Sequence, residues 1–120
     1  MAQSTEILPN GLQLLQDDRF FKLGQDSVLL SAFAKPRRNA KLLDLGCGTG
    51  ALALLVWRPD LTITGLELQD GPLDLFRQSI AANELENVTA LQGDLRQMRT
   101  LLPHGSMDYV ICNPPYFDRN

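Results

Sequence analysis

Residues 42–50 read LLDLGCGTG, and they carry the first signal of a fold in this chain of 120 residues. The apolar run at residues 41–45 has the length of a buried strand. The next run, residues 51–57, reads ALALLVW and stops at Arg58-Pro59, which favours a helix directly after the loop. A strand, a loop and a helix in this order predict a site where backbone N–H groups hold a polar ligand group. The loop glycines that let backbone approach a ligand are Gly46, Gly48 and Gly50.

Such a glycine segment alone equally suits a simple tight turn, and the spacing to the next strand favours a ligand. The strand expected at residues 61–66 ends at Glu67, about 20 residues after the first glycine, where a carboxylate can accept both ribose hydroxyls. Gly46-x-Gly48-x-x-Ala51 also satisfies the loose dinucleotide fingerprint, so a nicotinamide dinucleotide stays open here. Asp44, before the loop, favours a cationic amine over a pyrophosphate. S-adenosylmethionine carries such an amine.

A third strand is expected at residues 88–92 and is followed by Gly93 and Asp94. Open α/β sheets bind ligands at the carboxyl ends of their strands, so Asp94 could accept the exocyclic amine of an adenine. It could equally cap a helix at residues 95–102. Both interpretations of Asp94 stay open.

The fourth expected strand, residues 107–112, runs into Asn113-Pro114-Pro115-Tyr116-Phe117. A planar amine or amide nitrogen is a poor nucleophile, so a site that alkylates it must accept its hydrogens and favour a pyramidal geometry. The side-chain carbonyl of Asn113 and the main-chain carbonyl of Pro114 can do so. Pro114 and Pro115 stiffen the segment, and Tyr116 can stack on a flat substrate. The segment predicts transfer to a planar nitrogen.

With these motifs the chain resembles the class I S-adenosylmethionine-dependent methyltransferases that carry an Asn-Pro-Pro-Tyr clamp, specifically the bacterial tRNA1(Val) adenine-N6 methyltransferase family. The resemblance runs from Gly11-Leu12-Gln13 and FKLGQDSVLL at residues 21–30 through LLDLGCGTG to NPPYF at residues 113–117. It implies that the loop glycines, with Cys47 among them, line the methionine part of the cofactor, beside Asp44. It also implies that Glu67 holds the ribose, Asp94 the adenine, and residues 113–116 the target base, with Asn113 next to the cofactor.

The resemblance implies an α/β, Rossmann-like fold of which this chain holds the amino-terminal part, about four parallel strands with flanking helices. Residues 1–40 would form an amino-terminal hairpin and helix segment, and residues 41–120 an incomplete cofactor-binding core. The family sheet has seven strands, so its carboxyl-terminal half is expected to be missing after Asn120. The strand at residues 107–112 would then be an exposed edge that invites self-association.

Smaller elements follow from local patterns. A polar tail is expected first, then a hairpin within residues 11–23 that turns at Asp17-Asp18, and a helix at about residues 25–34. Between residues 71 and 83, apolar side chains recur at helical spacing and predict a helix that covers the sheet.

Composition predicts a globular, cytoplasmic protein: 44% of the residues are hydrophobic and 21% charged, and neither a membrane-spanning stretch nor a secretion signal is expected. Cys47 and Cys112 lack metal-ligand spacing, so no metal is expected, and both suit packing roles. The net charge of −3 argues against strong nucleic-acid binding by this chain alone. Four cations within residues 35–41 could touch RNA, although a solvated loop is favoured.

The expected function is methyl transfer from S-adenosylmethionine to the N6 amine of adenine in RNA, most of all tRNA. Protein glutamine in release factors is the alternative acceptor, because an amide nitrogen presents the same geometry to the clamp. A third hypothesis is a non-catalytic fragment that binds cofactor or pairs with another subunit through its edge strand.

Overall fold

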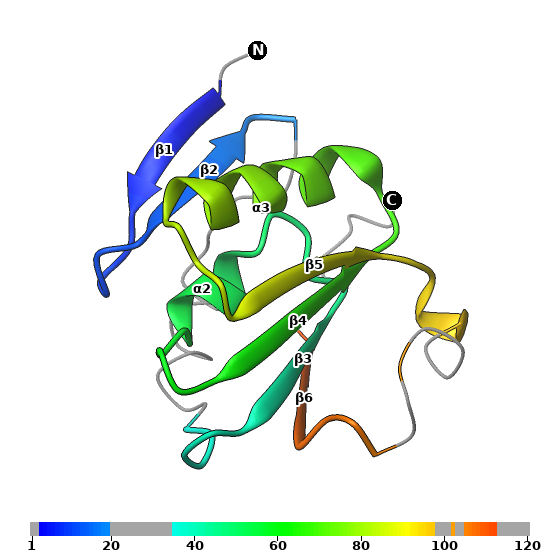
Figure 1. Ribbon diagram of the computed structural model, residues 1–120. Helices are drawn as coiled ribbons and strands as arrows, with labels where there is room; N and C mark the ends of the chain where they lie inside the picture. Colours follow the sequence, from blue (N-terminus) through cyan, green and yellow to red (C-terminus); the bar gives the residue numbers. More distant parts are fainter. Residues whose placement is uncertain (1–2, 20–34, 98–101, 103–104, 113–120) are drawn as a thin grey trace, which may run out of the picture.

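The computed structural model describes residues 3–19, 35–97, 102 and 105–112. Its main sheet has four parallel strands in the order β5-β4-β3-β6 (Figure 1). Their bounds are β3 (Lys41–Leu45), β4 (Thr62–Glu67), β5 (Val88–Gln92) and β6 (Tyr109–Cys112). This confirms the α/β fold class and each of the four predicted strands, with shifts of one or two residues at some ends.

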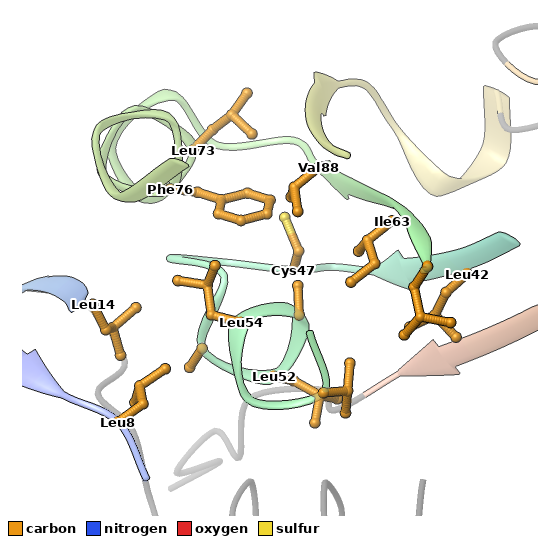
Figure 2. Close-up of a cluster of buried hydrophobic side chains, with 14 of the residues drawn as sticks. Leu8, Leu14, Leu42, Cys47, Leu52, Leu54, Ile63, Leu73, Phe76 and Val88 are labelled. Atoms are coloured by element: carbon orange, nitrogen blue, oxygen red, sulfur yellow. The ribbon is translucent and has the colours of Figure 1, made fainter. Parts of the chain in front are cut away.

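Two helices pack on a shared core with this sheet. Helix α2 (Ala51–Leu55) follows the glycine loop, and α3 (Asp70–Ala82) connects β4 to β5. Figure 2 shows how side chains from both helices, the loop and the strands point into one cluster. Phe76, at 0% exposure, lies at its centre, and burying a side chain of this size contributes about 1.5 to 3 kcal/mol.

Helix α3 confirms the amphipathic pattern at residues 71–83, whereas α2 is shorter than the predicted run at residues 51–57. Val56 closes α2, and the N–H of Trp57 donates to the carbonyl of Leu54 at 3.3 Å, the i→i−3 pattern of a tightened last turn. Residues 95–97, the start of a predicted helix, form a 3₁₀ turn.

The amino-terminal hairpin corrects the sequence prediction. Strand β1 (Gln3–Ile7), in the expected polar tail, pairs antiparallel with β2 (Gln13–Asp17), and the turn lies between them rather than at Asp17-Asp18. The N–H of Leu8 donates to the carbonyl of Leu12 at 2.8 Å, and Gly11 has a φ of 89°. Asn10-Gly11 was therefore the decisive turn signal: Gly11 supplies the left-handed backbone, and the side chain of Asn10 accepts from the N–H of Leu12 at 3.2 Å. The predicted helix at about residues 25–34 lies outside the described residues.

The hairpin lies beside α3 (Figure 1), and polar side chains on this helix and at its C-cap bind the backbone of β2. The Asn83 side chain accepts from the N–H of Gln13 and donates to its carbonyl, both at 2.8 Å, and the Ser79 hydroxyl accepts from the N–H of Leu15 at 2.9 Å. The helix thus satisfies backbone groups on the free edge of β2, which would otherwise stay unpaired. Leu8 and Leu14 of the hairpin belong to the same buried cluster as Phe76.

Candidate functional site

The carboxyl ends of the parallel strands bring most of the described predicted site residues to one edge of the sheet. The N–H of Cys47, in the loop after β3, donates to the carbonyl of Leu66 at 3.0 Å, and the N–H of Gly93 donates to the carbonyl of Glu67 at 3.1 Å. Cys112, the last residue of β6, is paired with Leu45. We call this edge the rim. It consists of residues 44–50, residues 67–70, residues 92–94 and Cys112.

The glycine loop depends on left-handed backbone. Gly46, Gly48 and Gly50 have φ values of 63°, 56° and 87°, which side chains with a Cβ rarely adopt. Gly50 is also crowded: a Cβ there would lie 2.1 Å from Cδ1 of Phe76. In the part of the chain that the structure describes, a Cβ at Gly46 or Gly48 would meet nothing within 4 Å. The three glycines therefore have different roles: Gly50 allows close packing against Phe76, whereas Gly46 and Gly48 leave space beside the loop among the described residues.

Glu67 accepts two backbone hydrogen bonds. The N–H of Gly48 donates to Oε1 at 2.8 Å, and the N–H of Gln69 donates to Oε2 at 3.0 Å. The N–H of Gly50 is likewise used, by the carbonyl of Cys47 at 2.9 Å. The loop N–H groups of Gly48 and Gly50 are thus already bonded within the protein, so they differ from the free donors that the sequence suggested for a ligand.

Asp44 is the most unusual group of the rim. Asp44 is only 1% exposed, and its Oδ2 has no hydrogen-bond partner among the described residues. Burial raises the pKa of Asp44 to about 7, the N–H of Ala53 opposes that shift, and the charge of Glu67 adds to it. A buried acceptor that has lost water without gaining a partner costs free energy, and a ligand donor would remove that cost.

The two cysteines are free thiols in different surroundings. Cys47 is buried, and Cβ atoms added to Gly65 would lie 2.8 Å from its Sγ, so it fills space beside β4. Burial first, then the charges of Asp44 and Glu67, raise the pKa of Cys47, which disfavours a reactive thiolate. Cys112 is exposed at the end of β6. In the described part of the chain, no cluster of three His, Cys, Asp or Glu residues suits a metal ion.

Asp94 already has a partner in the chain. Its carboxylate accepts from the N–H of Arg96 at 2.9 Å and forms an ion pair with the guanidinium at 2.6 Å. These contacts, the side-chain hydrogen bond first, lower the pKa of Asp94 to about 2. This geometry suits the capping interpretation. Arg96 is 88% exposed, so an ion pair of this kind holds the carboxylate only weakly against a competing ligand.

Two neighbours of the site escaped the sequence reasoning. Leu68, directly after Glu67, is 60% exposed and presents apolar surface at the rim. Phe76 packs against both Gly50 and Gly65, since a Cβ on Gly65 would lie 2.5 Å from its ring. An isolated glycine inside a strand signals a close approach of another group, and Gly65 was such a signal. The clamp residues Asn113, Pro114, Pro115 and Tyr116 lie outside the described residues.

The basic segment at residues 35–41 precedes β3 and so lies at the opposite end of the sheet from the rim. Arg37 forms an ion pair with Asp108 at 2.8 Å and lies over the ring of Tyr109, 5.9 Å from its centroid. The main-chain N–H of Lys41 donates to the same carboxylate at 2.8 Å. Part of this positive charge is therefore balanced by contacts that tie β6 to β3. No described helix has the length and apolarity that a bilayer crossing requires.

Comparison with known proteins found relatives of this sequence and of this fold. The family model described as methyltransferase small domain matches residues 24–120. The chain is 37% identical over 101 residues to the tRNA1(Val) (adenine(37)-N6)-methyltransferase of Pseudoalteromonas translucida, a match covering 82% of this chain and 42% of the relative. It is 34% identical over 100 residues to the enzyme of that name from Yersinia enterocolitica, covering 80% and 39%. The chain spans about two fifths of the length of these curated relatives.

Solved structures share the same fold. The M. jannaschii TYW2 structure in complex with AdoMet superposes with a TM-score of 0.73 at 17% identity, and the match covers 90% of this chain and 49% of that one. At this identity the likeness concerns the fold, and it agrees with the parallel sheet described above.

Proposed function

Because this chain belongs to the methyltransferase small domain family, we propose that its rim binds S-adenosylmethionine and that the protein methylates the N6 amine of an adenine in tRNA. The observation that carries the proposal is Asp44, a buried carboxylate whose Oδ2 has no partner among the described residues. A cytoplasmic location belongs to the same proposal, since the acceptor would be tRNA.

Charge favours this cofactor over a nicotinamide dinucleotide. Asp44 and Glu67 lie close enough for the charge of Glu67 to raise the pKa of Asp44. No ion pair or hydrogen bond joins either carboxylate to a Lys or Arg in the described part of the chain. A pyrophosphate would add negative charge beside them, whereas the ammonium and sulfonium of S-adenosylmethionine would neutralise it.

The residues of the rim fit the remaining parts of the cofactor. Each carboxylate oxygen of Glu67 accepts one backbone N–H and keeps further acceptor capacity for a ribose hydroxyl. Leu68 offers apolar surface for one face of the adenine ring. Asp94 would accept a hydrogen bond from the adenine amine once its ion pair with Arg96 has broken. The open space at Gly46 and Gly48 leaves room for the methionine chain.

The transfer itself needs positioning more than a strong base. The carbonyls of Asn113 and Pro114 would accept the two hydrogens of the adenine amine, while Tyr116 stacks on the base. The nitrogen lone pair forms a bond to the methyl carbon as the carbon–sulfur bond breaks, and the sulfur leaves as a neutral thioether. The methylated nitrogen then loses one proton to water, which restores its neutral charge.

The acceptor is tested by incubating the protein with isotope-labelled S-adenosylmethionine and either unmodified tRNA or a release factor, followed by mass analysis of both. We expect label on an adenine of the tRNA. Label on a glutamine of the release factor would replace tRNA as the substrate and leave the cofactor proposal standing. Absence of cofactor binding, together with dimers in size-exclusion chromatography, would instead support an association module.

For Asn113→Ala we expect methyl transfer to fall about 100-fold, because one preorganised contact to the reacting group is lost. Cofactor affinity, measured by calorimetry, should change less than about threefold, since the remaining rim contacts stay in place. Equal losses of methyl transfer and of cofactor affinity would show that Asn113 acts on the cofactor rather than on the acceptor nitrogen.

A further inference from the structure

The Glu67 carboxylate joins two backbone segments that would contact opposite halves of the cofactor. Oε1 accepts from Gly48 in the glycine loop at 2.8 Å, and Oε2 accepts from Gln69 at the start of α3 at 3.0 Å. Gly48 belongs to the part of the rim assigned to the methionine chain. Gln69 lies beside Leu68, in the part assigned to the adenine. The carboxylate therefore bridges the two halves before any ligand is present.

Among the described residues, the glycine loop has few other contacts of this kind. Its backbone is held by the N–H of Cys47 on Leu66, at 3.0 Å, by the N–H of Gly50 on Cys47, at 2.9 Å, and by the N–H of Leu54 on Gly50, at 2.9 Å. The thiol of Cys47 adds a weak contact to the carbonyl of Gly48 at 3.7 Å. No atom of the described residues lies within 4 Å of the Cβ position of Gly48, so their side-chain packing does not hold this residue in place. The hydrogen bond to Glu67 is charge-assisted and is the strongest tie that orients the Gly48 peptide.

We propose that Glu67 is a positioning residue for the methionine half of the cofactor as well as a ribose contact. The inference rests on the proposed function of the rim. A carboxylate has about four acceptor positions, and two are used by Gly48 and Gln69. The ribose hydroxyls can occupy the others without releasing the loop. Ribose and methionine binding are thereby coupled through one side chain that does not itself reach the methionine chain.

The test compares adenosine, which lacks the methionine chain, with S-adenosylhomocysteine, which has it. The variants are Glu67→Gln, which places an amide NH₂ where one backbone N–H needs an acceptor, and Glu67→Asp, which keeps the charge but is one methylene shorter. A residue that only contacts ribose would weaken both ligands by the same factor. A positioning residue should weaken S-adenosylhomocysteine about tenfold more than adenosine, in calorimetric or NMR titrations.

Amide hydrogen exchange provides a second measurement that needs no ligand. In the ligand-free protein, the Gly48 amide should exchange at least about tenfold faster in Glu67→Asp than in the wild type, because the shorter side chain withdraws its acceptor. In Glu67→Gln one oxygen remains for two N–H groups, so either the Gly48 or the Gln69 amide should exchange faster by a similar factor. Asp94→Asn is the matched control, because the contacts of this rim carboxylate in the described part of the chain are with Arg96 and not with the glycine loop. Asp94→Asn should weaken the binding of adenosine and of S-adenosylhomocysteine by the same factor, and it should leave the exchange rate of the Gly48 amide unchanged. Thermal unfolding of each variant establishes that it is folded.

Equal losses for both ligands, with Gly48 still protected, would overturn the positioning role and leave the proposed function intact. Failure of the wild-type protein to bind either ligand would overturn the proposed function itself. Faster exchange at Gly48 combined with an unequal loss of affinity would establish the role.

Discussion

Gly50→Ala is expected to destabilise the protein by about 2 to 5 kcal/mol. The new Cβ would lie 2.1 Å from Cδ1 and 2.5 Å from Cε1 of Phe76, which is fully buried, so the ring has no free direction to move. Overpacking of this kind costs about 1 to 3 kcal/mol, and the φ of 87° adds about 1 to 2 kcal/mol for a residue with a Cβ. For a domain of this size we expect a Tm lower by roughly 10 to 30 °C, measured by circular dichroism.

Gly46→Ala is the matched control for Gly50→Ala. It has the same kind of left-handed backbone, with a φ of 63°, but none of the residues that the structure describes lies within 4 Å of its Cβ position. Gly46→Ala should therefore destabilise the protein only by the cost of placing a Cβ on left-handed backbone, about 1 kcal/mol. Replacing Phe76 by leucine should destabilise the Gly50→Ala protein less than it destabilises the wild type, because it removes the clash. Equal destabilisation by both glycine substitutions would refute the packing explanation.

Asp44→Asn is expected to make the ligand-free protein more stable at pH 8 and to weaken cofactor binding at the same time. The folded-state pKa of Asp44 is about 7 against an ordinary value of 3.8, so the fold disfavours the ionised form. The contribution of Asp44 to the free energy of unfolding is therefore fully present below about pH 4, and it is lost as the pH rises to about 7. At about 1.4 kcal/mol per pKa unit, the wild type loses roughly 4 kcal/mol across this window, and Asp44→Asn should not.

Urea unfolding between pH 4 and 8 measures this difference, with saturating S-adenosylmethionine as a second condition. Among the described residues, the titratable groups that face Asp44 are Glu67, Cys47 and Cys112, and all three are acidic groups without positive charge to offer. A cationic ligand should therefore stabilise the wild type most at high pH and the variant much less. Asp74→Asn, an exposed carboxylate on α3, controls for the loss of one negative charge. If the free energy of unfolding depended on pH in the same way in the wild type and in Asp44→Asn, the raised pKa of Asp44 would be contradicted.

The alternation of strand and helix was readable from sequence because its signals are local. The apolar runs at 41–45 and 88–92 match β3 and β5 residue for residue, and the period of the 71–83 segment matches α3. The small amino-terminal hairpin was predicted, but its turn was misplaced because two polar turn signals competed, Asn10-Gly11 and Asp17-Asp18. Asp17 proved to be buried, with its carboxylate bound to Arg19 at 2.8 Å. Burial of that kind depends on the whole fold and leaves no mark in a short stretch of chain.

By itself, the sequence determined the parallel sheet, the glycine loop after its first strand and the placement of Glu67 and Asp94 at strand ends, because chain direction alone puts these residues on one edge. Only the tertiary structure decided what the side chains do there. It buried Asp44 with one oxygen lacking a partner among the described residues, gave Glu67 the N–H groups of Gly48 and Gln69, and paired Asp94 with Arg96. The physical reason is that desolvation and hydrogen-bond partners arise from groups brought together in space, which the order of residues along the chain does not specify.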